Sequence, residues 1–311
     1  KVDEKSTAVL VNTELDDKTK IVDVIALRGA LKLRYALRYV SATDFDSTIK
    51  QLLRDVEYRY ENKIVAVVCF AKNDIESNAI GRKIRDALET GKYNNIVFID
   101  ATMTPFGADG YGIYRHEMAL SNAWSSKDST LKSQYSSNAK EALKKWKNRI
   151  ASGEFVVYTA EKKDGERAVT IDDMYLILAG IDKKRFPCCL EGAYKVNETM
   201  YERSSLKLGV ECAVKQKTAQ AYNSNNPSTK LELALDGAWG VDNYWKKNTH
   251  ILISKIKNYV EDIINEDFNG SEGRVSIKKI YDALKVAPYG FMPCNLTAFI
   301  LGFLLKEYTD G

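Results

Sequence analysis

The chain has 311 residues, of which 45% are hydrophobic and 28% are charged, and its formal net charge is +4. This composition is typical of an ordinary soluble globular protein, and the length allows two domains. No apolar run approaches the roughly 18 residues that a membrane-spanning helix needs, so we expect no membrane partner. Two histidines and five scattered cysteines without a CxxC pair argue against a metal site and indicate a reducing compartment. We therefore expect a cytoplasmic protein without a cofactor.

The region from residue 63 to residue 101 predicts a strand, a helix and a second strand. Two short apolar runs, 64–71 and 95–100, flank an amphipathic segment at 74–88. Such a pattern is typical of a βαβ unit, in which buried parallel strands are covered by helices. We expect an α/β fold with a small Rossmann-like parallel sheet and flanking helices, occupying residues 1–125.

The residues before this unit predict a short strand at 7–12 and two helices. Apolar side chains recur at intervals of three and four residues from Asp17 to Tyr39, which indicates the first helix. The second helix is expected from Asp44, as its N-cap, to about Tyr60. These elements would complete the Rossmann-like domain.

The loop after the second strand of the βαβ unit is the first candidate site. Ligands of open α/β sheets bind at the carboxyl ends of strands, and Asp100 ends this strand. Gly107, Gly110 and Gly112 follow, in a stretch that opens a helix at about Tyr111, and they would let backbone N–H groups approach a phosphate at the helix N-terminus. Their order is GxxGxG, however, and no Walker lysine follows. The alternatives are a nucleotide or phosphate site and a plain turn in which Asp100 caps the loop.

A basic helix is the second candidate site. Residues 126–248 predict a helical region with a β-hairpin near residues 163–166, and its first helix spans 127–150. Residues 127–149 carry 7 basic and 2 acidic side chains, so the net charge of the whole chain arises on this helix. The alternatives are a solvated helix face and a docking strip for nucleic acid or an acidic partner. The residues of that strip are Lys132, Lys140, Lys144, Lys147 and Arg149.

Residues that would carry out catalysis are not evident in the sequence. His116 and Glu117 begin like a zinc-binding helix, but Leu120 stands where the second histidine is needed. No compact pair of nucleophile and base and no cluster of metal ligands occurs. We therefore expect no catalytic residue and no metal in this chain.

The last region, residues 249–311, predicts helices around a tight turn. An amphipathic helix is expected at 248–266, followed by helices at 275–284 and 293–308 that flank a turn at 286–290. Two helices around a tight turn indicate a helix-turn-helix or winged-helix-like arrangement. The chain begins at Lys1 without a methionine and stops directly after an apolar segment, and we expect it to be part of a longer polypeptide.

The C-terminal segment carries a family likeness. Ser276-Ile-Lys-Lys-Ile-Tyr-Asp-Ala-Leu284, followed by Ala287-Pro-Tyr-Gly290 and an apolar helix, resembles a winged-helix-like module of large bacterial P-loop ATPases, including the phage-exclusion type of antiviral defence. The likeness is confined to this segment, and no Walker A or Walker B pattern occurs in the chain. It implies that ATP hydrolysis belongs to another part of a larger protein.

Three functions are therefore open at this point. The leading expectation is a non-catalytic regulatory or interaction module whose partner is the rest of its parent polypeptide or assembly. The first alternative is an enzyme or binding domain for a nucleotide or phosphate ligand at the 100–112 loop. The second alternative is nucleic-acid binding through the helix at 127–149.

Overall fold

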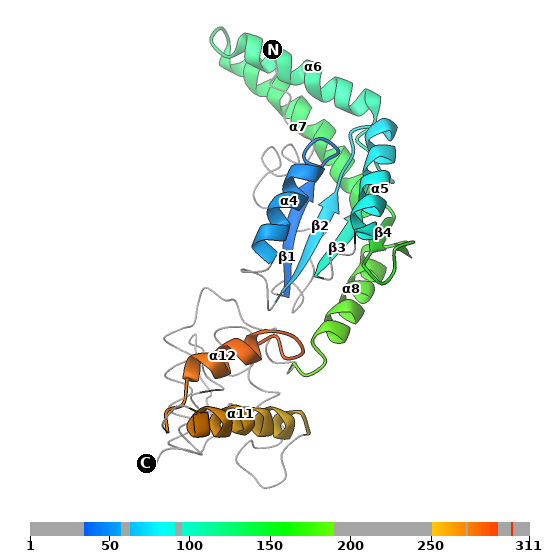
Figure 1. Cartoon of the computed structure of the whole chain (residues 1–311). Helices are drawn as coiled ribbons and strands as arrows, with labels where there is room; N and C mark the ends of the chain where they lie inside the picture. The colour runs from blue at the N-terminus through cyan, green and yellow to red at the C-terminus, as the bar shows by residue number, and fades with distance from the viewer. Residues whose placement is uncertain are drawn as a thin grey trace, which may run out of the picture. The chain divides into compact units, whose positions relative to one another are not determined.

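The computed structural model describes residues 34–56, 63–90, 95–189, 251–270, 273–291 and 300 (Figure 1). The described residues fall into two compact units. The first unit contains residues 35–56 and 64–180, and the second contains Arg34, Lys63 and the described residues from 181 onward.

A five-stranded mixed sheet lies at the centre of the first unit. The first three strands run parallel and the last two pair antiparallel, in the spatial order β1-β2-β3-β4-β5. The strands are β1 (Tyr35–Val40), β2 (Ile64–Cys69), β3 (Ile96–Asp100), β4 (Phe155–Tyr158) and β5 (Glu166–Ala168). The α/β class, the parallel βαβ unit and the β-hairpin are confirmed, whereas the sheet as a whole is mixed rather than parallel.

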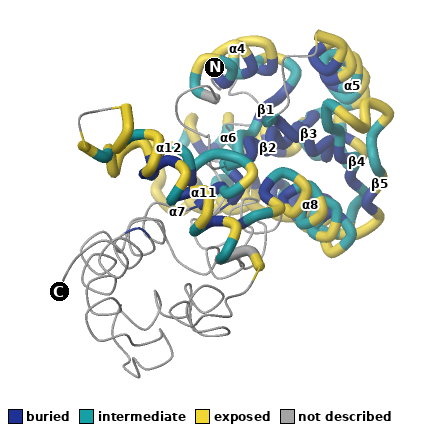
Figure 2. Tube along the Cα trace, turned by 60° about the horizontal axis from the view of Figure 1, so that its bottom comes forward, coloured by how far each residue is buried: buried dark blue, intermediate teal, exposed yellow. Residues whose placement is uncertain are grey.

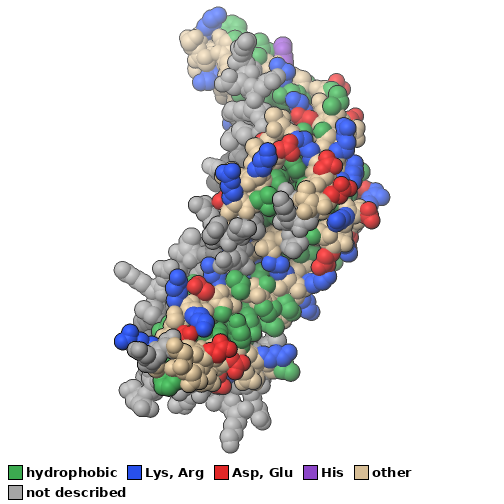
Figure 3. Space-filling view, in the orientation of Figure 1, with side chains coloured by type: hydrophobic (Ala, Val, Ile, Leu, Met, Phe, Trp, Pro, Cys, Tyr) green, Lys and Arg blue, Asp and Glu red, His purple; other side chains and the backbone are tan. Residues whose placement is uncertain are grey.

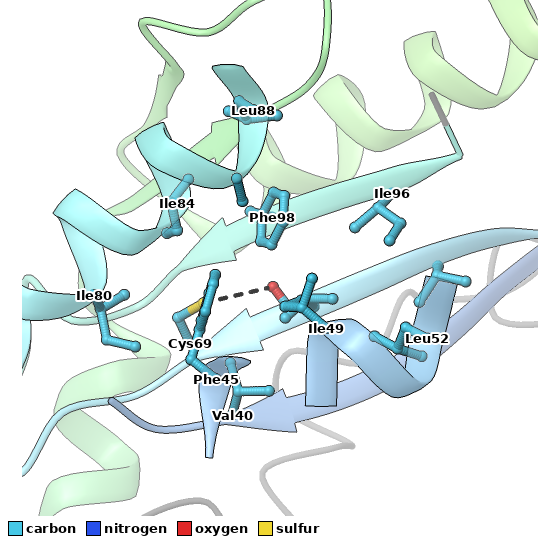
Figure 4. Packing of buried hydrophobic residues seen from close by; sticks show 13 residues of the cluster. Val40, Phe45, Ile49, Leu52, Cys69, Ile80, Ile84, Leu88, Ile96 and Phe98 are labelled. Carbon is cyan, nitrogen blue, oxygen red and sulfur yellow. Dashed lines mark hydrogen bonds between the residues drawn. The ribbon is translucent and has the colours of Figure 1, made fainter. Parts of the chain in front are cut away.

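Two helices cover one face of the sheet. Helices α4 (Phe45–Val56) and α5 (Asp74–Glu89) follow β1 and β2 respectively, and α5 begins at its N-cap Asn73, whose side chain accepts a hydrogen bond from the Glu76 amide. Side chains that alternate along the strands point toward both helices, as expected for the two-residue period of a strand. This apolar core is shown in Figures 2 and 4 and includes Val65, Val67, Cys69, Ile96, Phe98, Phe45, Ile49, Leu52, Ile80, Ile84 and Leu88.

The opposite face of the sheet packs against helices from later in the chain. Trp146 of α7 (Ser129–Ala151) meets Phe70, which follows β2, with ring centroids 6.1 Å apart in an edge-on arrangement. The Tyr35 hydroxyl donates to the Leu178 carbonyl of α8 (Ile171–Arg185) at 2.6 Å. The sheet is therefore covered on both faces, which explains why all six residues of β2 are buried.

Helices α6 (Ala108–Trp124) and α7 pack side by side and form a helical hairpin, residues 108–151. The N-cap of α7 is Asp128, whose carboxylate accepts hydrogen bonds from the Thr130 and Leu131 amides. Figure 1 shows that this α6–α7 hairpin extends well beyond the sheet. The predicted helix at 127–150 is confirmed. Helix α6 begins at Ala108, before the predicted start at about Tyr111, so that Gly110 as well as Gly112 lies inside the helix.

The predicted helix from Asp17 to Tyr39 is wrong in its last residues. Residues 35–39 belong to β1, which pairs with β2 in the register Tyr35 to Ile64 and Val40 to Cys69. Pairing with a fully buried strand outweighs the helix propensity of Ala36, Leu37 and Arg38, because propensity is a weak preference that tertiary contacts override. Apart from Arg34, the rest of the predicted helix lies outside the described residues, as does the predicted strand at 7–12.

The described part of the second unit is mainly helical. Helices α11 (Ile251–Gly270) and α12 (Ile277–Lys285) confirm two of the predicted helices, and α12 begins at Ser276, whose hydroxyl accepts a hydrogen bond from the Lys279 amide. The turn at 286–290 is also present, with the Gly290 amide donating to the Val286 carbonyl at 2.7 Å. The helix expected at 293–308 lies outside the described residues apart from Ile300, so a winged helix is not shown.

Candidate functional site

Asp100 lies where the sequence placed it, at the carboxyl end of β3 and beside Cys69 of β2. Its side chain is only 6% exposed, and Oδ1 accepts a hydrogen bond from the Thr102 amide at 2.8 Å. Burial raises the pKa of the Asp100 carboxyl, while the hydrogen bonds from Thr102 act in the opposite direction. The carboxyl group thus caps the turn after β3, in agreement with the plainer of the two alternatives.

The loop that follows Asp100 folds back over the end of the sheet. The Phe106 amide donates to the Ala71 carbonyl at 3.0 Å, and the Gly107 amide donates to the Lys72 carbonyl at 2.9 Å. The Ser77 hydroxyl lies 2.8 Å from Thr102 Oγ1. These contacts join the loop to the residues after β2, at the position where an open α/β sheet binds its ligand. The polar groups at the carboxyl ends of β2 and β3 therefore stabilise the fold.

Cys69 is paired with Asp100 across β2 and β3, and its thiol is not activated as a nucleophile. The thiol is fully buried, and burial together with the nearby Asp100 and Asp44 carboxylates raises its pKa well above the usual value. A thiol must ionise to act as a nucleophile or metal ligand. In the part of the chain that the structure describes, no group of three or more histidine, cysteine or carboxylate side chains lies where it could hold a metal ion.

A pocket of about 690 Å³ opens at the start of α6, next to the predicted glycine loop. Gly107 precedes the helix with φ of 88°, a conformation that favours glycine, and provides no side-chain cap for the first turn. Gly107 and Gly110 line the pocket, whereas Asp100 and Gly112 do not. The full lining is Phe106, Gly107, Ala108, Asp109, Gly110, Ile113, Glu117, Asn138, Glu141, Ala142, Lys145, Trp146 and Arg149.

The end of α7 holds the loop that borders this pocket. The Trp146 ring stacks on Phe106 with centroids 4.7 Å apart, and its Nε1 donates to the Thr104 carbonyl at 2.9 Å. Arg149 donates to the Phe106 carbonyl at 2.7 Å and to the Pro105 carbonyl at 3.2 Å. Arg149 therefore lines the pocket while it fixes the loop, a role that its place in a charged strip did not predict.

The charges around the pocket are mixed and do not clearly favour the binding of an anion. Three carboxylates, from Asp109, Glu117 and Glu141, line it together with the cations of Lys145 and Arg149. The Glu117 carboxylate also accepts a hydrogen bond from Asn138 at 2.8 Å, which links α6 to α7. A phosphate at this position would gain from the α6 N-terminus and the two cations but would be repelled by the carboxylates.

The residues of the predicted basic strip differ in their exposure to solvent. Lys132 and Lys140 line a hollow of about 440 Å³ on α7, and Lys144 is exposed one turn further on. Lys147 is only 8% exposed, so the prediction that it lies with Lys140 and Lys144 on one solvated face is wrong. The reason is that α7 packs against the sheet near its end, and the face that is exposed at Lys140 becomes buried at Lys147.

The hairpin is exposed along most of its length. In α6 the buried residues are Tyr114 and Ser121, and in α7 every buried residue comes from position 139 onward. Figure 3 shows Lys and Arg side chains at the outer end of the hairpin, among hydrophobic and other side chains. The serines beside Lys132 and Lys140 were not singled out from the sequence, although their helical spacing at 129, 133, 136 and 137 is a signal that was available.

Comparison with known proteins does not extend this picture. No protein-family model, no curated protein and no solved structure matches the chain. Among the described helices, none combines the length and the apolar character needed to cross a membrane.

Proposed function

We propose that this chain is a non-catalytic interaction module of a larger bacterial protein, with the α6–α7 hairpin as its contact surface. The observation that carries the proposal is the exposure of the hairpin: α6 has 17 residues and buries two, and the outer half of α7 buries none. A helix in a protein gains most of its stability from packing on other elements. A long helix pair that packs so little against its own sheet leaves extensive surface for another molecule.

The end of the sheet supports the non-catalytic part of the proposal. The Asp100 carboxyl group accepts a hydrogen bond within the turn after β3. The raised pKa of the Cys69 thiol keeps this thiol protonated at neutral pH. The loop from Thr102 to Gly107 forms hydrogen bonds with the residues that follow β2. Groups that would serve as base or nucleophile in a site of this kind therefore have structural roles.

We further propose that the larger protein is a cytoplasmic P-loop ATPase of the antiviral-defence type. The resemblance of residues 276–290 to a winged-helix-like module of such ATPases supports this. The turn at the centre of that resemblance ends at Gly290, whose amide donates to the Val286 carbonyl and whose φ is positive. In this proposal another part of the protein hydrolyses ATP, and this chain forms contacts with that part or with the rest of the assembly.

A nucleotide assay tests the absence of catalysis. The purified chain is expected to release no phosphate from ATP or GTP with Mg²⁺ beyond the protein-free blank, because no activated base or nucleophile is present at the sheet edge. The control is Asp100→Asn, which keeps an acceptor for the Thr102 amide. Phosphate release that disappears in this variant without a change in melting temperature would contradict the proposal.

A nucleotide or phosphate ligand in the α6 pocket is the second candidate function. It is favoured by one observation, the meeting of the uncapped α6 N-terminus with Lys145 and Arg149 in one pocket. The same panel of nucleotides tests it through the melting temperature. A rise that is lost in Lys145→Ala would support binding, and no rise at millimolar ATP, GTP or inorganic phosphate would rule it out.

A further inference from the structure

One surface of the hairpin has a composition that differs from the rest of α7. Four serines and two lysines surround the hollow of about 440 Å³ on the outer part of this helix. We name this surface the Ser/Lys face, and its residues are Ser129, Lys132, Ser133, Ser136, Ser137 and Lys140. Each of these side chains ends in a hydrogen-bond donor, and none carries a negative charge.

The positive charge of this face is not neutralised within the described residues. Neither Lys132 nor Lys140 forms an ion pair with a carboxylate there. The two acidic residues nearest in sequence make other contacts: the Asp128 carboxylate accepts hydrogen bonds from the Thr130 and Leu131 amides, and Glu141 lines the pocket on the α6 side. Lys144 extends the positive charge by one further turn. The face is therefore complementary to an anionic surface.

The spacing of the lysines fits a polymer of closely spaced negative charges. With a rise of about 1.5 Å per residue, Lys132 and Lys140 are separated by about 12 Å along α7, and Lys144 lies about 6 Å further on. Duplex DNA carries one negative charge for every 1.7 Å or so of its axis, so each lysine finds phosphates within reach. Serine hydroxyls between the lysines match the neutral donors that commonly contact phosphate oxygens.

The composition also separates nucleic acid from an acidic protein as the partner. The centres of protein–protein interfaces are enriched in aromatic residues, methionine and arginine, and the Ser/Lys face contains none of these. It also has no aromatic ring on which an unpaired base would stack. Arginine, asparagine and glutamine, whose planar groups contact two atoms of one base edge, are absent from the six residues. These features favour contact with the backbone of a duplex, independent of its sequence.

We propose that the Ser/Lys face of α7 binds the phosphate backbone of duplex nucleic acid without sequence specificity. The inference rests on the proposed role of the hairpin as a contact surface, and it names the partner of one part of that surface. Lys147 and Arg149, which are buried or bound to the loop at 105–106, take no part in the contact.

Fluorescence anisotropy of a fluorescein-labelled, mixed-sequence DNA duplex, titrated with the whole chain, tests the inference. The variant Lys132→Glu/Lys140→Glu is expected to bind at least about tenfold more weakly, because lysine contacts release counterions from the duplex. Wild-type affinity should fall with salt, with a log–log slope of about −2 or steeper. The matched control is Lys50→Glu/Arg54→Glu, two exposed basic residues of α4 with the same change in charge.

Three results would overturn the inference. These are an absence of binding to the duplex at 50 mM salt, equal losses in the Ser/Lys variant and in the control, and tighter binding to a single strand of the same length. A parallel titration with poly-glutamate separates the two classes of partner. Binding to poly-glutamate but not to the duplex would overturn the nucleic-acid assignment and leave the hairpin as a contact surface. Circular dichroism checks that both variants remain folded.

Discussion

Replacing Arg34 with methionine is expected to lower the free energy of unfolding of the second unit by about 3–5 kcal/mol. Arg34 is fully buried, and its Nε lies 3.1 Å from Oδ1 of Asp182, whose side chain is 5% exposed. The two side chains form a buried ion pair. The substitution removes the cation and leaves the Asp182 carboxylate buried beside an apolar side chain.

Arg34 also connects segments that are distant in the sequence. Its guanidinium donates to the Gly290 carbonyl and lies 3.2 Å from the Cys189 sulfur. The guanidinium carbon is 4.3 Å from the centroid of the Phe186 ring. Gly290 has φ of 60°, and a Cβ there would lie 2.3 Å from the Phe186 ring. The turn at 286–290 thus depends on this cluster, and we expect the loss of Arg34 to destabilise α12, which directly precedes the turn.

Hydrogen exchange of peptides that cover residues 273–291 measures the effect. Exchange should accelerate in Arg34→Met, and the double variant Arg34→Met/Asp182→Leu should recover most of the protection, because replacing both members of a buried ion pair is far less costly than removing one. If Arg34→Met costs less than about 1 kcal/mol, or if the double variant is no more stable than the single one, the ion pair does not have this role.

Replacing Trp146 with alanine should have a comparable effect on the first unit, with a loss of about 3–5 kcal/mol. Trp146 is 1% exposed and lies between the Phe70 and Phe106 rings. Alanine leaves a cavity between α7 and the sheet and removes the hydrogen bond to the Thr104 carbonyl. The loop at 102–107 should then detach together with the start of α6.

Denaturant unfolding, followed by circular dichroism, measures this loss, and limited proteolysis reports on the loop. Trp146→Phe is the control, because it keeps an aromatic ring between Phe70 and Phe106 and loses the indole hydrogen bond, a change of about 1 kcal/mol beyond the packing effect. Equal stability of Trp146→Ala and the wild type would show that α7 does not hold the loop.

The βαβ unit could be predicted because its signals are local. Residues 64–69 and 96–100 are apolar throughout, and a helix with an N-cap at Asn73 lies between them. The strand at 35–40 could not be predicted in this way, because it pairs with residues of β2 that lie about thirty positions away in the sequence. In addition, several of its own residues favour a helix. Local patterns determine which elements form only where tertiary pairing does not oppose them.

The candidate site shows the same limit. The glycines at 107 and 110 and the basic residue Arg149 belong to two separate predicted sites, and the structure brings them, together with Lys145, to one pocket. No pattern indicates that Trp146 would stack on Phe106, forty residues earlier. The burial of Lys147 was also not predictable, because helical periodicity gives the face of a residue but not where along the helix that face becomes covered.

Hydrogen exchange across the α6–α7 hairpin tests the proposed role of this chain most directly. The comparison is between the isolated chain and the complete product of the reading frame that encodes it, after nuclease treatment. We predict slower exchange in residues 108–151 within the larger protein, with exchange in β2 and β3 unchanged. Equal exchange of the hairpin in both proteins, or a reading frame that encodes no further domain, would contradict the account.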